Sequence, residues 1–295
     1  MISQFAPAKI NLYLHITGRR PDGYHVLDSL TAFAGVGDEI RLEPAAHFDF
    51  AVEGPQAALL RDEPVEKNLV VKVARGLAER TGKNLDLRLT LVKNLPVASG
   101  IGGGSSDAAA ALRALALHWG VDSGDPGFWD VAALGGQDVP VCLRAETCYI
   151  TEEGTAAGPI LPHTDIVLVN PNQSLPTVEV YKCFRDDGFA FSAPARLKES
   201  PQNVAELATS LKERGNDLAA PALKLRPVIG QVIMALEATQ HCVFARMSGS
   251  GATCFGLYPG RDHARKAAAE ILEAHPDWWV IQSHIPKHAD RRQRF

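Results

Sequence analysis

The feature that most constrains the fold of this chain is a glycine-rich segment that runs directly into an alanine-rich one. It reads Leu95-Pro96-Val97-Ala98-Ser99-Gly100-Ile101-Gly102-Gly103-Gly104-Ser105-Ser106-Asp107-Ala108-Ala109-Ala110. The glycines let the backbone approach a ligand closely, and the serines and alanines open a helix whose first N–H groups are free. Such a helix N-terminus attracts phosphate oxygens, so the segment predicts a phosphate-binding loop. The alternative is a structural turn capped by serine.

The common nucleotide-binding loops do not fit this segment. The chain has no G-x-x-x-x-G-K-[ST], and residues 100–105 lack the last glycine of G-x-G-x-x-G. A protein kinase would also need an H-R-D segment, which the sequence does not contain. The loop is therefore expected to belong to another class of phosphate-binding protein.

Length and charge narrow the class of protein further. A chain of 295 residues suits two domains better than one, because single cores stop growing near about 250–300 residues. The formal net charge of −4 gives no general attraction to nucleic acid or to anionic membranes. The five cysteines form no C-x-x-C pair and no zinc spacing, and no apolar segment approaches ~18 residues. We expect a cytoplasmic monomer or weak homodimer with reduced thiols and no nucleic-acid or membrane partner.

Near the N-terminus, polar and apolar residues alternate from Lys9 to Ile16. This pattern predicts a half-buried strand with a polar face. The apolar face carries Ile10, Leu12, Leu14 and Ile16, and the polar face carries Lys9, Asn11, Tyr13 and His15. The following Pro21, Asp22 and Gly23 predict a tight turn.

Elsewhere the hydrophobic patterns predict an α+β fold divided near residue 154. Asn68 is the predicted N-cap of a helix that ends near Gly82. Further helices are expected near residues 105–119, 128–134, 204–214, 228–238 and 264–273, and strands near 39–42, 48–52, 85–92, 166–169, 243–247, 253–257 and 279–282.

Three segments of the chain resemble the motifs of the GHMP kinase superfamily. The loop of residues 95–110 is similar to the second motif, residues 6–14 (Ala-Pro-Ala-Lys-Ile-Asn-Leu-Tyr-Leu) to the first, and residues 247–256 to the third. Within the superfamily, residues 18–25 and 102–107 resemble the diphosphocytidyl-methylerythritol kinases in particular. So do residues 135–140, with Gln137 in place of a more usual Ala or Ser.

The resemblance implies a two-domain GHMP kinase fold with its active site in the cleft between the domains. Residues 1–154 would form a nucleotide-binding domain closed by about 284–295, and residues 155–283 a substrate domain. ATP with Mg²⁺ would phosphorylate the 2-hydroxyl of 4-diphosphocytidyl-2-C-methyl-D-erythritol, a step in the non-mevalonate isoprenoid route. Two alternatives stay open: a GHMP kinase acting on a different alcohol, and a ligand sensor that kept the fold without catalysis.

The resemblance also assigns roles to individual residues. Lys9 would balance charge on the transferred phosphoryl group, and Asp138 would accept the proton of the substrate hydroxyl or hold its oxygen in line. Tyr24 and Tyr181 would stack on cytosine, and His25 would bind its polar edge. No metal ligand is assigned beyond Ser106 as a candidate. The implied ATP-binding residues are Asn68, Leu69, Lys93, Pro96, Val97, Ala98, Ser99, Gly100, Ile101, Gly102, Gly103, Gly104, Ser105 and Ser106, and the implied substrate-binding residues are Asn11, Tyr24, His25, Thr177, Tyr181, Gly249, Ser250 and Gly251.

Several of these residues have a plainer structural explanation. Asn68 would also be explained as a helix cap without a ligand, and Asp138 as a turn former without a catalytic role. Gly249, Ser250 and Gly251 would also suit a tight turn between two strands, and Asp107 would suit the positive end of a helix dipole.

Overall fold

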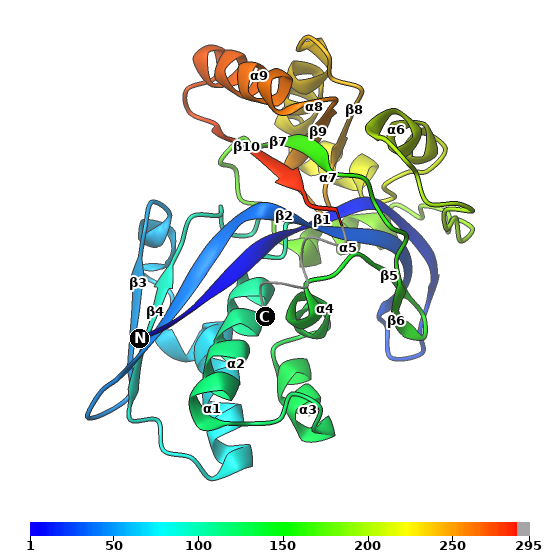
Figure 1. Cartoon of the computed structure of the whole chain (residues 1–295). Helices are drawn as coiled ribbons and strands as arrows, with labels where there is room; N and C mark the ends of the chain where they lie inside the picture. The colour runs from blue at the N-terminus through cyan, green and yellow to red at the C-terminus, as the bar shows by residue number, and fades with distance from the viewer. Residues whose placement is uncertain (288–295) are drawn as a thin grey trace. The chain divides into compact units, whose positions relative to one another are not determined.

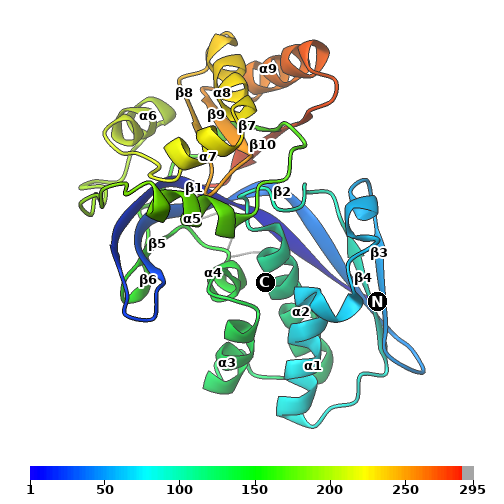
Figure 2. The ribbon, with the colours of Figure 1, turned by 180° about the vertical axis from the view of Figure 1, so that it is seen from behind.

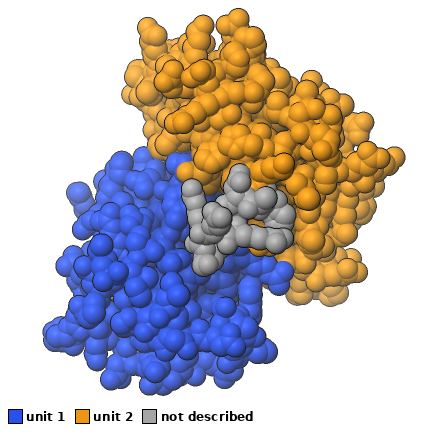
Figure 3. All heavy atoms as spheres, viewed as in Figure 1, with its two compact units in different colours: residues 1–9, 36–97, 102–145 blue, residues 10–35, 98–101, 146–295 orange. Residues whose placement is uncertain are grey.

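The computed structural model describes residues 1–287, and the chain divides into two units (Figure 3). Unit 1 consists of Met1–Lys9, Val36–Val97 and Gly102–Ala145, and unit 2 consists of Ile10–Gly35, Ala98–Ile101 and the chain from Glu146 onward. These units interleave along the sequence, and the linear bounds 1–154 and 155–283 stay a prediction. Most of the segment 284–295, predicted to close the first domain, lies outside the described residues.

Unit 1 contains a small sheet and a group of helices. Strand β4 pairs in parallel with β3 and antiparallel with β2, with Glu39 of β2 opposite Val92 of β4. Helix α1 contacts α2 and α3, and α2 contacts α4; α1 and α2 lie side by side in both ribbon views (Figures 1 and 2). The elements are β1 (Ile2–Arg19), β2 (His25–Pro44), β3 (Asp49–Glu53), the 3₁₀ turns η1 (Ala57–Leu60) and η2 (Val65–Lys67), α1 (Leu69–Thr81), β4 (Leu87–Val92), α2 (Gly103–Trp119), α3 (Pro126–Leu134) and α4 (Asp138–Arg144); β1 and β2 also contribute residues to unit 2.

Helix α1 has the ends that its sequence predicts. The side chain of Asn68 accepts a hydrogen bond from the backbone N–H of Val70, 3.0 Å away. At the other end Gly82 takes a left-handed conformation with φ of 65°, which closes the helix by a bond to the carbonyl of Ala78. Both caps satisfy backbone groups that have no partner inside the helix.

Strand β1 differs from its prediction, because both of its faces are buried. Only 5% of Lys9, 3% of Asn11 and 8% of His15 is exposed. Alternation of polar and apolar residues predicts a solvent-facing side, but a polar side chain can be buried where it finds hydrogen-bond partners. Each of these three side chains has such partners, so the half-buried strand was a wrong prediction.

Unit 2 is built on an antiparallel sheet in the order β10-β7-β9-β8, with helices α8 and α9 in contact with it (Figure 1). Residues 29–31 of β2 pair with β5, which pairs with β6. The elements are β5 (Cys148–Thr151), β6 (Gly154–Ala157), β7 (Thr164–Asn170), α5 (Thr177–Asp186), α6 (Val204–Lys212), α7 (Ala219–Leu225), α8 (Val228–Ala238), β8 (Phe244–Met247), β9 (Cys254–Tyr258), α9 (Arg261–Ala274) and β10 (Trp279–Ile285). The sequence patterns did not predict α4, α5, α7, β5 or β6.

Among residues 1–287, no single helix has the length and apolar character needed to cross a membrane. The consecutive helices α7 and α8, which are bent by 116° relative to each other, have that length and composition only as a pair.

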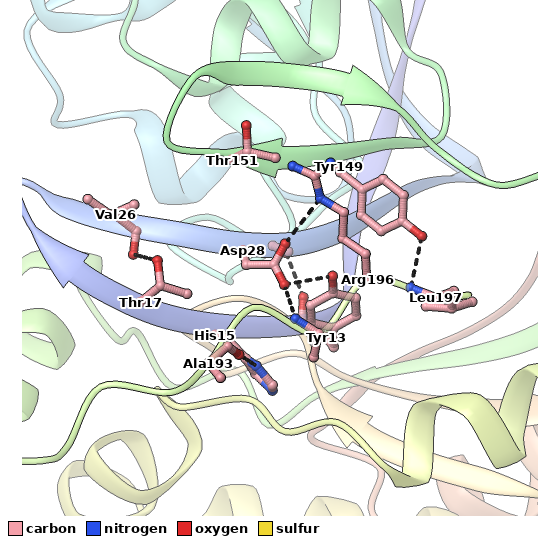
Figure 4. A network of polar contacts seen from close by, with 12 residues as sticks. Tyr13, His15, Thr17, Val26, Asp28, Tyr149, Thr151, Ala193, Arg196 and Leu197 are labelled. Carbon is pink, nitrogen blue, oxygen red and sulfur yellow. Dashed lines mark hydrogen bonds and ion pairs between the residues drawn. The ribbon is translucent and has the colours of Figure 1, made fainter. Parts of the chain in front are cut away.

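In unit 2, residues 192–197 form an irregular segment whose backbone is held by side chains of three strands (Figure 4). His15 Nδ1 donates to the carbonyl of Ala193 (2.9 Å), the N–H of Ala195 donates to Asp28 Oδ2 (2.6 Å), and the N–H of Leu197 donates to Tyr149 Oη (3.2 Å).

Asp28 is the buried charge of this network. Its Oδ2 also accepts from the hydroxyl of Tyr13 at 3.1 Å, and Arg196 Nε lies 3.9 Å from its Oδ1. Burial, together with the negative charge of Asp28, raises the pKa of Tyr13 far above its usual value, so the phenol keeps its proton. A phenol, a backbone amide and a guanidinium therefore share one carboxylate.

Candidate active site

Lys9 and Asp138, the two predicted catalytic residues, meet in unit 1. Lys9 Nζ lies 2.7 Å from Asp138 Oδ1. Lys9 reaches this point from β1 and is 6% exposed in its side chain, whereas Asp138 is the first residue of α4 and its side chain is 44% exposed. The ammonium of this pair is therefore buried, whereas part of the Asp138 side chain still faces solvent.

The glycine-rich loop touches this pair through Gly102. Gly102 has φ of 63°, and a Cβ atom at this position would lie 3.0 Å from Lys9 Cβ and 3.1 Å from Lys9 Cε. A side chain here would press on Lys9 and strain the left-handed backbone, so glycine suits this position on both counts. Helix α2 begins at the next residue, Gly103.

Ser106, the candidate metal ligand, lies in the first turn of α2. It is fully buried, and its hydroxyl donates to the carbonyl oxygen of Pro7 at 2.7 Å. Within the described part of the chain, no group of three or more His, Cys, Asp or Glu side chains is arranged to hold a metal ion.

Lys93, predicted to lie near ATP, is held in a buried cluster with two aspartates. Its Nζ lies 2.6 Å from Asp38 Oδ2 and 2.7 Å from Asp107 Oδ2. Asp38 Oδ1 also accepts hydrogen bonds from the backbone N–H groups of Asn94 and Leu95. The cluster lies directly below the loop, since a Cβ atom at Gly103 would be 3.1 Å from Lys93 Nζ.

The charged groups in this cluster shift one another's pKa. Burial raises the pKa of Asp107 to about 8; Lys93 opposes this change and the negative charge of Asp38 adds to it. Burial disfavours the charged form of Lys93, but the two carboxylates outweigh it and raise the pKa of Lys93. Asp38 and Asp107 were not among the predicted site residues, because nothing in the sequence connects them to Lys93.

A pocket of about 270 Å³ lies beside the N-terminus of α1 in unit 1. Asn68, one of the predicted ATP-binding residues, contributes to its lining, and its side chain also caps α1. The other lining residues are Phe50, Val52, Ala57, Ala58, Leu60, Arg61, Glu63 and Val65. The pocket has the mixed apolar and polar wall that suits a planar base.

The remaining loop residues, Ala98–Ile101, belong to unit 2, where they contact the third motif. A Cβ atom at Gly100, which has φ of 74°, would lie 2.5 Å from the backbone N of Gly251. The carbonyl of Ser99 accepts from the N–H of Thr253 at 3.1 Å. Residues 249–251 therefore support this stretch of the loop by direct backbone contact.

Two other predicted substrate residues, Asn11 and Thr177, contact the third motif. The side-chain amide of Asn11 donates to Ser29 Oγ at 2.8 Å, and its backbone N–H donates to Ser248 Oγ. Thr177 at the start of α5 shares a hydrogen bond of 2.8 Å with Ser250. The sequence reading missed Asn216, whose side chain donates to the carbonyls of Met247 and Gly249 and so fixes this turn.

The turn at Gly23 presents Tyr24 and His25 in unit 2. The exposed fraction of Tyr24 is 60%, whereas His25 stacks on Tyr181 with ring centroids 5.0 Å apart. His25 also meets Phe184 edge-on at 5.8 Å, a contact that the sequence did not predict. Burial, with the positive charges of Arg19 and Arg185, lowers the pKa of His25 and favours a neutral ring at pH 7.

Comparison with known proteins identifies the family. The description "GHMP kinases N terminal domain" matches residues 68–146, and "GHMP kinases C terminal" matches residues 192–277. A 4-diphosphocytidyl-2-C-methyl-D-erythritol kinase of Rhodospirillum rubrum is 46% identical over 286 residues, which cover 96% of this chain and 92% of the relative. The corresponding kinase of Cereibacter sphaeroides is 49% identical over 291 residues, covering 97% of this chain and 99% of the relative.

The chain belongs to the 4-diphosphocytidyl-2-C-methyl-D-erythritol kinase family. A crystal structure described as 4-(cytidine 5'-diphospho)-2C-methyl-D-erythritol kinase superposes with a TM-score of 0.75 at 30% identity, covering 97% of this chain and all of that one. Homoserine kinase from Cytophaga hutchinsonii gives a TM-score of 0.69 at 18% identity, covering 97% of this chain and 95% of that one, and shares the fold alone. The predicted superfamily, the α+β kinase fold and a phosphotransferase activity that uses ATP are confirmed.

Proposed function

We propose that this kinase transfers the γ-phosphoryl group of ATP to the 2-hydroxyl of 4-diphosphocytidyl-2-C-methyl-D-erythritol, in the non-mevalonate route to isoprenoids. The observation that carries the proposal is the 2.7 Å contact of Lys9 with Asp138, next to Gly102 of the phosphate loop, in a chain of this family. We also propose that it acts in the cytoplasm, as a monomer or weak homodimer.

In the proposed reaction, Asp138 accepts the proton of the substrate hydroxyl or holds that oxygen in line. Lys9 holds Asp138 in place through their 2.7 Å ion pair, and its positive charge offsets the charge on the transferred phosphoryl group. The residues from Gly102 to Ser105 supply backbone N–H groups at the start of α2 for the phosphate oxygens. Because this transition state is loose, positioning and charge carry most of the catalysis.

Mg²⁺ is part of the proposal as a companion of ATP. Protein-bound Mg²⁺ commonly keeps one or two carboxylate ligands and takes the rest from phosphates and water. The described residues contain no group of three or more His, Cys, Asp or Glu side chains that could hold a metal ion. We therefore assign no step and no protein ligand to the ion, and propose that the substrate phosphates bind it.

In unit 2 we assign the cytosine to the surface formed by Tyr24, His25 and Tyr181. A neutral His25 has one donor and one acceptor nitrogen, which suits the mixed polar edge of cytosine. The stacking of His25 on Tyr181, with ring centroids 5.0 Å apart, gathers aromatic rings at this surface and supports the assignment.

A coupled assay of ADP release tests the proposal against its alternatives. The alcohols are the cytidylyl substrate, mevalonate, homoserine and galactose, each with MgATP. We expect rapid turnover only with the cytidylyl substrate. Turnover with another alcohol would indicate a different GHMP kinase, and binding of both ligands without ADP release would indicate a sensor.

A further inference from the structure

Arg113, on α2, donates hydrogen bonds to two other elements of unit 1, β1 and α4. Its Nη2 lies 2.7 Å from the carbonyl oxygen of Phe5. Its Nη1 donates to the carbonyls of Cys142 and Leu143, at 3.2 and 3.4 Å, and its Nε donates to Gln4 Oε1 at 3.3 Å. Neither the motifs nor the family comparison draws attention to this residue.

The acceptors of Arg113 lie on the two elements that carry the catalytic pair. Phe5 is on β1, four residues before Lys9, and Cys142 and Leu143 close the short helix α4 that Asp138 opens. Arg113 itself belongs to the helix that starts at the phosphate loop. One guanidinium group therefore joins the helix of the loop, the strand of Lys9 and the helix of Asp138.

Helix α4 needs an external support to hold Asp138 in one place. It has seven residues, and a helix of two turns is unstable on its own. Its last carbonyl groups have no partners inside the helix, and a cation at this end also complements the helix dipole. Arg113 meets both needs through a planar fork of donors that fixes the geometry of the carbonyls it binds.

We propose that Arg113 is a positioning residue that sets the separation of Lys9 and Asp138 for phosphoryl transfer. Burial lowers the pKa of Arg113 to about 10, with Cys142 opposing the change, so the guanidinium stays charged at neutral pH. Ser106 forms a separate link from α2 to β1 through Pro7, but no bond from Ser106 fixes α4. The inference rests on the proposed function, since Lys9 and Asp138 are its catalytic groups.

The first test compares Arg113→Met with Arg113→Lys and with a matched control. Methionine keeps much of the apolar stem and removes every donor, whereas lysine keeps the charge but loses the fork. The control is Arg214→Met in unit 2, because Arg214 is also largely buried and donates to backbone carbonyls, those of Ala195, Ser210 and Arg196. Unfolding by urea is measured for all three variants.

We expect Arg113→Met to lower kcat by ~10- to 100-fold, the scale on which small displacements act, with KM for ATP and for the alcohol changed by less than about threefold. Arg113→Lys should retain more activity than Arg113→Met. Arg214→Met should keep the kcat of the wild type, although it should lose about as much stability as Arg113→Met. A folded Arg113→Met enzyme with normal kcat, or an equal loss of kcat in Arg214→Met, overturns the proposal.

The second test is a double-mutant cycle with Asp138→Asn. If Arg113 acts by placing Asp138, Arg113→Met should cost little further activity once Asp138 is asparagine. A purely structural role predicts that the two losses multiply, and that result overturns the proposal even if the first test succeeds. Failure of the proposed function looks different, because the wild-type protein would then not turn over the cytidylyl substrate at all.

Discussion

Lys93 donates a hydrogen bond of 2.7 Å to Asp107 below the glycine loop, where the exposed fractions of both side chains are only 3%. Because Asp38 shares the same ammonium group, two carboxylates compete for one positive charge. The other oxygen of Asp107, Oδ1, has no hydrogen-bond partner among the residues that the structure describes. A carboxylate with so little support is expected to take up a proton.

Stability should therefore depend on pH through Asp107. Its pKa rises from 3.8 in the unfolded chain to about 8 in the folded protein, mainly because of burial. Between these values the unfolded chain has released the proton and the folded protein keeps it, so the free energy of unfolding falls as pH rises. The Asp107→Asn protein serves as the control, because asparagine has no carboxyl group to titrate. We expect the wild type to lose more stability than Asp107→Asn between pH 5 and pH 8 in urea unfolding; parallel curves would mean that Asp107 is ionised throughout.

Gly102→Ala should lower kcat by displacing Lys9. The new Cβ atom would lie 3.0 Å from Lys9 Cβ, too close for an unshifted side chain. Gly120→Ala is the matched control: Gly120 has φ of 66°, close to the 63° of Gly102, but no atom lies within 4 Å of its Cβ position. Each variant should lose about 1–2 kcal/mol from left-handed strain. We expect a fall in kcat only for Gly102→Ala; equal kinetics for the two variants would show that this contact does not matter.

Asp138→Asn should reduce kcat while substrates still bind. Asparagine keeps the shape of Asp138 and removes its basic oxygen, and general-base catalysis contributes ~10²–10⁴-fold. Single-turnover rates at saturating substrates measure the loss, and Asp130→Asn, at an exposed position on α3, serves as the control. A loss below about tenfold would favour a role for Asp138 in orienting the hydroxyl rather than accepting its proton.

Tyr24→Ala should weaken binding of the cytidylyl substrate. Stacking of a base on an aromatic ring contributes ~1–3 kcal/mol, which corresponds to a rise in KM of roughly 5- to 150-fold. KM for ATP should change little, and Tyr24→Phe should behave like the wild type because the ring remains. If KM for ATP changes instead, Tyr24 belongs to the nucleotide pocket and the assignment of cytosine is wrong.

The sequence predicted the elements whose ends and periodicity are local. The span of α1 follows from Asn68 and Gly82, and the glycine loop followed by α2 is recognisable because its residues are contiguous. Helix α4 was not predicted, since seven residues with Pro140 among them show no clear period. Its backbone is supported by Arg113, 29 and 30 residues away in sequence, which no local pattern contains.

The same limit explains what was missed in the site. Lys93 was predicted to be near ATP from the family resemblance, but Asp38 lies 55 residues before it and only the folded chain joins them. The burial of β1 on both faces has the same origin, because the partners of Lys9 and His15 lie 129 and 178 residues away. A polar pattern alone does not distinguish a side chain facing water from one facing a distant partner.

Side chains from elsewhere in the chain hold residues 192–197 through the backbone groups of this segment, and this has an evolutionary consequence. His15, Asp28 and Tyr149 bind a carbonyl and two N–H groups that any residue except proline supplies equally well. Positions 193, 195 and 197 are therefore free to drift in sequence without moving the backbone, provided that proline stays out of 195 and 197. Among homologues, selection should act instead on the three anchoring side chains. These residues lie far from the segment in sequence, and we expect them to diverge less than the segment that they hold.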